Sequence, residues 1–374
     1  MSQLSQQAPQ YIRDIAPYKA GKPVSQVARE LGLNPQTIIK LASNENPLGP
    51  GEKARQAISV ALNDLGRYPD SNGFELKHTL SELLLVQPQQ ITLGNGSNDI
   101  LELVAKAFLS HGTQAVFSQY AFAVYGLATQ ACGAECNVVP ANNYGHDLPA
   151  FLKAINSKTR VVYLANPNNP TGTFINPQDI QHFLKQVPPT VVVVLDEAYT
   201  EYLTPGQQYN SIAWIEQYPN LLVTRSFSKA HGLAGLRVGY GVSSVEITDL
   251  LNRVRQPFNV NAVALAAAQA SLSDDFFLQK TYALNRNGLL QLQAGLDAEK
   301  LQYIPSSGNF ILFKVGENQD DGMKLFFALQ ELGVIVRPVA SYDLGQWIRV
   351  SIGLEEENAQ FLKALPIALK KVRA

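Results

Sequence analysis

The sequence predicts an α/β protein, with a doubly wound, mostly parallel sheet between helices and a smaller α+β domain after it. Purely apolar runs at 161–165, 191–195 and 221–223 are typical of strands covered on both faces. Helix-period stretches separate these runs, which is the order expected of a doubly wound layer. From about residue 265 the pattern changes to a long helical region and short alternating strands. These observations together predict two domains.

Each element follows from its local pattern. Residues 1–48 are polar and dotted with prolines, so we expect an arm that lies over a domain. Next come a predicted strand, glycine turn and helix at 89–109 and a strand and helix at 115–134. The remaining predicted units are strands beginning near 159, 190 and 220, a helix at 260–272, short strands at 308–315, 333–338 and 347–353, and a C-terminal helix. The expected limits are 1–48 for the arm, 49–264 for the large α/β domain and 265–374 for the small α+β domain.

The composition narrows the function classes. A chain of 374 residues is long enough for about two domains. Its charged fraction of 16% is low, and its hydrophobic fraction of 46% predicts a large interior or surface buried in an oligomer. A net charge of −1, without basic or acidic blocks, argues against a nucleic-acid binder with a broad positive face and against an electrostatic membrane anchor.

The cysteines and the N-terminus bear on metal binding and location. Cys132 and Cys136 form a lone pair without a histidine cluster, which predicts two half-buried thiols and no metal site. The N-terminus has no apolar segment of the signal-peptide kind, and no run of about 18 apolar residues occurs. We therefore expect a soluble, cytoplasmic protein.

Polar groups follow the predicted strands at their carboxyl ends, where open α/β sheets bind ligands. In "LGNGSNDI" (93–100), two glycines and a serine mark a strand-to-helix junction, where Ser97, Asn98 and backbone N–H groups could hold a phosphate. An ordinary glycine turn with Ser97 or Asn98 as N-cap explains the same residues and, taken alone, is favoured.

Two more strand ends carry polar side chains. In the turn-forming "NPNNPTG" (166–172), Asn169 could donate its amide to a ligand, or could cap the loop. Asp196 follows five apolar residues, so a buried carboxylate there needs a cation or several donors. A helix cap or a structural ion pair is the alternative for Asp196. Tyr199 could aim its hydroxyl at the same place.

Lys229 lies among small and apolar residues in "TRSFSKAHGLAGLRVGY" (224–240). A lysine desolvated at a strand end has a lowered pKa and can act as an amine nucleophile, although a snorkelling surface lysine is the ordinary explanation. Ser226, Ser228 and Arg237 could hold a dianionic phosphate, Arg237 through a bidentate fork. A phosphate cup, a buried aspartate, a phenol, an amide and a desolvated lysine are together what pyridoxal phosphate needs.

The motifs "NPNNPTG", "DEAY" and "SFSKAHGLAGLRVGY" resemble those of the fold-type I pyridoxal-phosphate aminotransferases. More narrowly, "LASNENPLGP", "RYPD" and "NGSNDILEL" resemble the histidinol-phosphate aminotransferase family. The resemblance covers the chain from about residue 11 to the C-terminal helix. It implies the fold-type I architecture and pyridoxal 5′-phosphate as the cofactor.

The resemblance also implies roles for individual residues. Lys229 would form the Schiff base with the cofactor and shuttle a proton, Asp196 would keep the pyridine nitrogen protonated, and Tyr199 with Asn169 would bond the 3′ oxygen. Phe122 corresponds to the aromatic that stacks on the ring, with Tyr120 as the rival. The phosphate would be held by Ser97, Asn98, Ser226, Ser228 and Arg237. His231 receives no role and is expected to be structural.

For the substrates, the resemblance implies two arginines and a dimer. Arg349 would meet the carboxylate of glutamate or the phosphate side of histidinol phosphate, with Arg337 as a second substrate arginine. Tyr18 and Asn44 match substrate-side positions of the arm. Tyr68, in "RYPD", resembles the tyrosine that reaches into the neighbouring subunit's site, which implies a homodimer with shared active sites.

The implied reaction is a ping-pong transamination. Glutamate donates its amino group and leaves as 2-oxoglutarate, and imidazole-acetol phosphate then takes the amine to become histidinol phosphate. An aromatic amino-acid aminotransferase and a decarboxylase of a phosphorylated amino acid are the alternatives that keep Lys229 and Asp196. A transcription regulator is disfavoured because the arm is too short and insufficiently basic for an added DNA-binding segment.

Overall fold

The computed structural model describes residues 3–17 and 21–373. Its centre is a seven-stranded sheet in the order β2-β8-β7-β6-β5-β3-β4. The strands from β7 to β4 pair in parallel, whereas β8 runs antiparallel to both β2 and β7. The bounds are β2 Ile91–Gly94, β3 Gln114–Ser118, β4 Glu135–Val139, β5 Thr159–Ala165, β6 Val192–Asp196, β7 Leu221–Ser226 and β8 Gly239–Ser243. The predicted mostly parallel sheet is confirmed.

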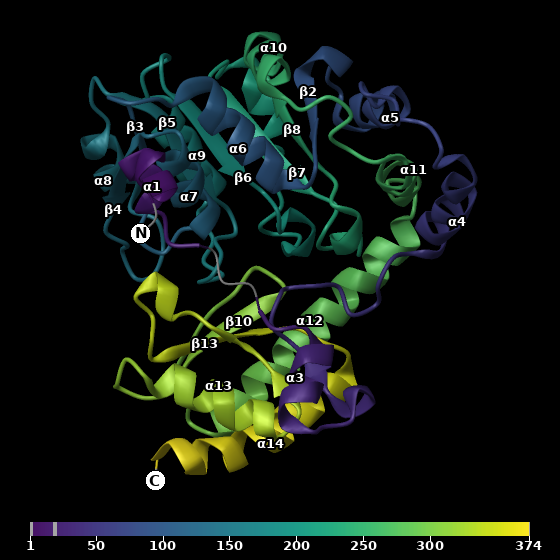
Figure 1. Ribbon diagram of the computed structural model, residues 1–374, viewed down its shortest axis with the longest axis vertical. Coiled ribbons are helices and arrows are strands. Elements are labelled where there is room, and N and C mark those ends of the chain that lie inside the picture. Colours follow the sequence, from purple (N-terminus) through teal and green to yellow (C-terminus); the bar gives the residue numbers. More distant parts are fainter. Residues whose placement is uncertain (1–2, 18–20, 374) are drawn as a thin grey trace.

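Helices cover both faces of this sheet, in the upper half of Figure 1. One face carries a core built with α6 (Ser97–Phe108), α7 (Ala123–Ala131) and α10 (Val245–Val254). The other face packs on α5 (Phe74–Leu84), α8 (Leu148–Ala154), α9 (Pro177–Leu184) and α11 (Ala262–Ser271), and α4 (Glu52–Ala61) packs on α11. These two cores explain why the strands are apolar throughout. No helix of the described residues is long and apolar enough to cross a membrane.

The C-terminal part of the chain builds a second layer around a four-stranded antiparallel sheet in the order β12-β13-β10-β9. Its strands are β9 Tyr303–Ile304, β10 Phe310–Lys314, β12 Arg337–Pro338 and β13 Trp347–Ser351. The helices α12 (Asp275–Ala298), α13 (Asp321–Glu331) and α14 (Glu355–Arg373) share an apolar core with this sheet. In Figure 1 the long helix α12 runs from the upper half of the molecule into the lower one.

The N-terminal segment contacts both halves. Helices α1 (Gln3–Gln7) and α2 (Gln10–Arg13) lie at the upper half, where α2 packs on α7. Helix α3 (Val24–Leu31) forms a small core with Ile335, and β1 (Ile39–Lys40) pairs in parallel with β11 (Val334–Ile335). The segment from Lys40, the last residue of β1, to Glu45 leads into the pocket described below.

The remaining short helices are 3-10 turns at Pro35–Thr37, Leu62–Asp64, Pro88–Gln90, Thr200–Tyr202, Ile212–Glu216, Ala234–Leu236 and Ala340–Tyr342. The expected domain limits at 48/49 and 264/265 stay predictions. Because Ala264, Ala267 and Ala268 of α11 belong to the core of the large sheet, we propose that the second limit lies between α11 and α12.

Two stretches differ from their expected form. The strand expected at 333–338 is divided: β11 pairs with β1, and β12 pairs with β13 in another sheet. Strand β8 has no counterpart among the predicted strands: its first two residues end the ligand-binding stretch 224–240, and its other residues lie beyond that stretch. It contains glycines because a Cβ on Gly241 would lie 2.9 Å from Ile100 Cγ2, and one on Gly239 would lie 2.5 Å from the Ser97 nitrogen. Because the close packing of α6 on β8 requires glycines, this strand lacks the apolar pattern by which the other strands were predicted.

The strand register places the polar groups side by side. Ala165 of β5 pairs with Asp196 of β6, and Asp196 pairs with Thr224 of β7. Since these strands are parallel, the loops that follow them, with Asn169, Tyr199 and Lys229, leave the sheet at the same edge.

Candidate active site

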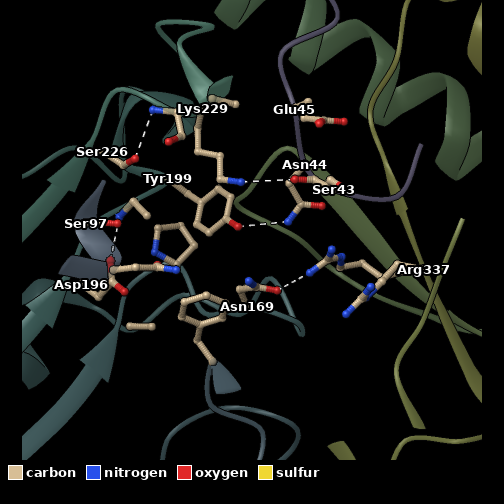
Figure 2. A pocket seen from close by; sticks show the side chains of 18 of the residues that line it. Ser43, Asn44, Glu45, Ser97, Asn169, Asp196, Tyr199, Ser226, Lys229 and Arg337 are labelled. Atoms are coloured by element: carbon tan, nitrogen blue, oxygen red, sulfur yellow. Dashed lines mark hydrogen bonds between the residues drawn. The ribbon is translucent and has the colours of Figure 1, made fainter. Parts of the chain in front are cut away.

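A cavity of about 420 Å³ opens at the carboxyl ends of the parallel strands, and its walls come from the arm, the large sheet and the small sheet (Figure 2). It brings together most of the predicted site residues, namely Asn44, Ser97, Asn98, Phe122, Asn169, Asp196, Tyr199, Ser226, Ser228, Lys229, Arg237, Arg337 and Arg349. Residues far apart in the sequence thus converge on one pocket.

Asp196 ends β6 and is buried at the floor of the pocket. The Tyr125 hydroxyl donates to its Oδ2 at 2.8 Å, and the Thr224 hydroxyl and the Ala198 N–H donate to its Oδ1, each at 3.2 Å. Burial raises the pKa of Asp196, and the hydrogen bonds from Tyr125 and Thr224 act in the opposite direction. These three donors therefore stabilise the ionised form of a carboxylate that is buried.

Lys229 lies on the loop after β7 and points into the same pocket (Figure 2). Its Nζ donates to the Ser43 carbonyl oxygen at 3.3 Å and lies 5.7 Å from the centre of the Tyr199 ring. Burial lowers the pKa of Lys229 to about 8, and the nearby charges of Arg349 and Arg237 contribute in the same direction. An amine of this pKa is partly neutral near pH 7 to 8 and can act as a nucleophile.

Tyr199 and Asn44 form a second polar pair beside Lys229. The Asn44 Nδ2 donates to the Tyr199 hydroxyl oxygen at 3.0 Å, and the Ser351 hydroxyl donates to Asn44 Oδ1 at 2.9 Å. Burial raises the pKa of Tyr199 to about 12, so its phenol keeps its proton. The Asn44 contact joins the arm, the large sheet and the small sheet at one point.

Arg349 of β13 connects the small sheet to the pocket. Its Nη1 donates to Asn169 Oδ1, and its Nη2 donates to the Ala42 carbonyl oxygen at 2.9 Å. The guanidinium also lies 5.3 Å from the centre of the Phe310 ring. Because Arg349 occupies the oxygen of Asn169, the amide nitrogen of Asn169 is the group that remains to donate to a ligand.

Four side chains form an anion cup at the start of α6. The Arg237 Nη1 donates to the Ser228 hydroxyl at 3.1 Å, and the Ser228 N–H donates to Ser226 Oγ at 3.1 Å. Ser97 is the first residue of α6 and is buried beside them, so backbone N–H groups of the helix face the same space. Positive partial charge, hydroxyls and a guanidinium together suit a phosphate.

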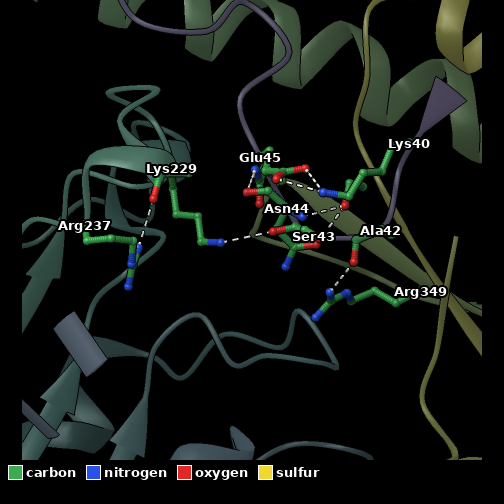
Figure 3. A network of polar contacts seen from close by, with 11 residues as sticks. Lys40, Ala42, Ser43, Asn44, Glu45, Lys229, Arg237 and Arg349 are labelled. Carbon is green, nitrogen blue, oxygen red and sulfur yellow. Dashed lines mark hydrogen bonds and ion pairs between the residues drawn. The ribbon is translucent and has the colours of Figure 1, made fainter. Parts of the chain in front are cut away.

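The mouth of the pocket carries an ion pair of the arm (Figure 3). The Lys40 Nζ donates to both carboxylate oxygens of Glu45 at 3.0 Å. Both residues line the pocket with Arg337, which is half-buried on the small-domain side. Charges of both signs thus line this side of the pocket.

Some predicted residues lie elsewhere. Tyr68 is 83% exposed and stacks on Phe258 with ring centroids 4.8 Å apart, away from the pocket lining. Tyr18 lies outside the described residues. Of the two aromatic candidates, Phe122 lines the pocket, whereas Tyr120 stacks on Tyr144. His231 is buried against the Phe227 ring and does not line the pocket.

The whole chain is similar to known proteins. The family model described as aminotransferase class I and II matches residues 36–365 of the chain. The chain belongs to the class I and II aminotransferases. Among its curated relatives, histidinol-phosphate aminotransferase 1 of Cupriavidus pinatubonensis is 58% identical over 97% of this chain and 96% of its own length. Histidinol-phosphate aminotransferase 2 of Ralstonia nicotianae is 57% identical over 98% of each chain.

A solved structure shares the fold of this aminotransferase over nearly its full length. The histidinol-phosphate aminotransferase of Sinorhizobium meliloti, determined in complex with pyridoxal-5′-phosphate, superposes with a TM-score of 0.90 at 26% identity. The match covers 97% of this chain and 98% of that one. The predicted fold-type I architecture is confirmed.

Sequence reasoning missed several residues that shape the pocket of this aminotransferase. Tyr125 lines it and bonds Asp196, while Lys40, Ser43 and Glu45 of the arm line its mouth. Tyr125 lies three positions after Phe122 and shares its face of α7, so helical spacing could have indicated it. The contact of the arm with Lys229 has no such local signal because 186 positions separate the two segments.

Proposed function

We propose that this aminotransferase moves an amino group between L-glutamate and imidazole-acetol phosphate, which becomes histidinol phosphate, with pyridoxal 5′-phosphate as cofactor. The observation that carries the proposal is one pocket that combines Lys229, Asp196 and the anion cup. Relatives 57–58% identical to the chain, named histidinol-phosphate aminotransferases, support the choice of substrate.

The residues present fit the cofactor. Gly96 has φ +83°, and a Cβ there would collide with the Arg237 guanidinium, so glycine keeps the cup open and lets the guanidinium lie against the turn. The cup with Ser97, Ser226 and Ser228 would hold the phosphate, joined by Asn98. The Phe122 ring, which lines the pocket, would stack on the pyridine ring.

Two residues would perform the chemical step. Pyridoxal phosphate, when bound, supplies an aldehyde carbon that carries the amino group and a ring that accepts electron density. Lys229 would attack that carbon through Nζ and, once displaced by substrate, would move the proton away from the substrate Cα. Asp196 would accept a hydrogen bond from the ring nitrogen through Oδ2. Its negative charge keeps the proton on that nitrogen.

Tyr199 and Asn169 would orient the cofactor. The Tyr199 oxygen accepts from Asn44, which leaves its own proton to be donated into the pocket. Asn169 has its oxygen engaged by Arg349, which leaves its Nδ2 as a donor. Both donors suit the 3′ oxygen of the cofactor, a negatively charged acceptor.

Arg349 and Arg337 would select the substrates. Both line the pocket on the side of the small sheet, opposite the cup that would hold the cofactor phosphate. Two guanidinium groups can donate to the carboxylates of glutamate in one half-reaction and to a phosphate monoester in the other. Asn44 lies beside them, and Tyr18 is assigned to this side by resemblance alone.

We further propose a homodimer in which Tyr68 enters the site of the partner. Tyr68 stacks on Phe258, which is also exposed, and Leu62, Leu65 and Phe74 are further exposed apolar side chains near Tyr68 in the sequence. Exposed apolar side chains of this kind on a single chain support a subunit interface. Both cysteines are free thiols, which agrees with the reducing cytoplasm that the sequence predicts.

Steady-state assays test the proposed substrate. We expect kcat/KM for histidinol phosphate with 2-oxoglutarate to exceed that for phenylalanine or tyrosine by at least about tenfold. The imidazole and the aryl ring have similar sizes, whereas the phosphate of histidinol phosphate carries more charge and more acceptor oxygens for an arginine than the carboxylate of phenylalanine. A higher kcat/KM for phenylalanine would replace the proposal with an aromatic aminotransferase. Release of CO₂ from threonine phosphate would replace it with the decarboxylase.

A further inference from the structure

The acceptor sites of Asp196 are almost filled by the chain itself. An ionised carboxylate offers about four lone-pair sites. The Thr224 hydroxyl and the Ala198 N–H occupy Oδ1, and the Tyr125 hydroxyl occupies one site of Oδ2 at 2.8 Å. One acceptor site on Oδ2 remains, on a carboxylate that lines the pocket.

We propose that Tyr125 is a positioning residue for the reaction: its hydroxyl fixes Oδ2 of Asp196 and leaves a single acceptor site there for the ring nitrogen of the cofactor. The inference rests on the proposed function, because that function assigns the ring nitrogen to Asp196. It adds a residue that touches the carboxylate and acts only through it.

The packing around Tyr125 supports this role. The ring has 0% exposure and stacks on Tyr163 of β5, with centroids 4.7 Å apart and planes at 4°. Phe117 and Phe122 contact it edge-on at centroid distances of 6.5 and 6.0 Å. A ring held on several sides cannot turn its hydroxyl away, so the donor stays aligned with Asp196.

The electrostatics agree with this geometry. Burial raises the pKa of Tyr125 well above its ordinary value, and the charge of Asp196 raises it further. The phenol therefore keeps its proton and acts as a donor near neutral pH. In return, its hydrogen bond lowers the pKa of the buried Asp196 and opposes the effect of desolvation.

The effect of removing the hydroxyl follows from this balance. In Tyr125→Phe, Asp196 loses a donor and becomes more basic, so the proton shared with the ring nitrogen moves toward the carboxylate. A ring that is less often protonated accepts less electron density, which slows proton removal from the substrate. Loss of a hydrogen bond to a charged group predicts a rate about tenfold lower.

Tyr163→Phe is the matched control. Its hydroxyl is also buried but donates to the Leu101 carbonyl oxygen at 3.4 Å, whereas the donors to Asp196 are Tyr125, Thr224 and Ala198. Both variants keep the stacked rings and lose one buried hydroxyl, so any common loss of stability cancels in the comparison. Thr224→Val serves as a second test, since it removes one of two donors to Oδ1 and should give a smaller change in the same direction.

The experiment uses full-length protein loaded with pyridoxal phosphate carrying ¹⁵N in the ring. We expect the ¹⁵N resonance of Tyr125→Phe to move toward the unprotonated ring, with cofactor affinity at least about threefold weaker and the glutamate half-reaction about tenfold slower. Tyr163→Phe should keep the wild-type resonance and a rate within about twofold.

Two results would overturn the role of Tyr125. One is a wild-type ¹⁵N resonance in Tyr125→Phe, and the other is an equal change in Tyr125→Phe and Tyr163→Phe. Absence of histidinol phosphate turnover by the wild-type protein would instead refute the proposed substrate. The ¹⁵N comparison would still decide the role of Tyr125 in that case.

Discussion

Two charges of opposite sign tune the amine of Lys229. Its pKa is about 8 because burial disfavours the charged form, and Arg349 lowers the pKa further while Glu45 raises it. The reactive neutral amine should therefore be available about two pH units below the ordinary range of a lysine, near 10.5. Because individual side chains set the pKa of Lys229, each contribution can be tested by a single substitution.

We predict that the apoprotein captures pyridoxal phosphate at a rate that rises with pH, with a midpoint near pH 8. Arg349→Gln should move the midpoint upward, because a positive neighbour is lost, and Glu45→Gln should move it downward. Visible absorbance after rapid mixing gives the rate at each pH. A midpoint near 10.5, or one that neither substitution moves, would contradict the prediction.

Glu201, in the turn after β6, gives a prediction on stability. Burial raises the pKa of Glu201 from 4.5 to about 7, although Arg225 opposes the shift. Between these pH values the folded protein holds a proton that the unfolded chain releases. The free energy of unfolding therefore falls as pH rises through this window and stays lower above it.

Glu201→Gln should remove that penalty. We expect it to raise the free energy of unfolding at pH 8 by about 2 to 3 kcal/mol, and to leave it nearly unchanged at pH 4.5. Chemical denaturation at the two pH values measures the difference. Equal effects at both would mean that the carboxyl does not titrate in this window.

At the scale of elements, the turn between β2 and α6 combines two requirements. It must aim the N-terminus of α6 at the pocket, and it must let the Arg237 guanidinium approach the backbone. Gly96 meets both, since φ +83° suits glycine and a Cβ would collide with Arg237. The anion cup thus depends on an element boundary as much as on its donors.

Gly96→Ala should weaken the affinity for pyridoxal phosphate by at least about tenfold, because the guanidinium must move away from the cup. Gly112→Ala is the control: Gly112 has φ +84°, but a Cβ there meets nothing within 4 Å. Both variants carry the backbone strain, and only the first disturbs Arg237. Titration of the two apoproteins with the cofactor, followed by fluorescence, separates strain from collision.

Elements differed in how well the sequence predicted them. The strands β5, β6 and β7 are apolar on both faces, and their pattern is visible without any partner. Strand β8 was missed because the close packing of α6 requires glycines in it, and glycines do not form a strand pattern. The strand expected at 333–338 is divided because its two halves pair with different, distant strands. Local pattern predicts an element when its own side chains determine burial, and fails when contacts from elsewhere do.

The same distinction holds for the whole molecule. Parallel strands bring their carboxyl ends to one edge, so the convergence of Asn169, Asp196 and Lys229 on one pocket could be expected from their positions after the ends of such strands. The roles of these residues and of Arg349 came from resemblance to a family. The meeting of Ser43 with Lys229, and of Asn44 with Ser351, depends on how the arm and the small domain close on the sheet, which no local pattern contains.

At the scale of the whole assembly, we predict that each active site is completed by Tyr68 of the other subunit. If Tyr68 serves the partner's pocket, a Lys229→Ala subunit still offers an intact Tyr68, and a Tyr68→Ala subunit still offers an intact Lys229. Each variant alone should be impaired, Lys229→Ala by about 10² to 10⁴-fold as expected for loss of a group that transfers protons. Mixed after unfolding and refolding, the two should form hybrids in which one of the two pockets is complete.

The mixture should therefore recover about a quarter of wild-type activity, since random pairing makes about half of all dimers hybrid and each hybrid has one complete pocket of two. The control mixes Lys229→Ala with Phe276→Ala, a change at an exposed aromatic of α12. The Phe276→Ala protein keeps both Tyr68 and Lys229, so it is active before mixing. The formation of hybrids should therefore not raise the total activity of this control mixture. Recovery no greater than the sum of the two separate variants would show that Tyr68 acts within its own subunit or not at all.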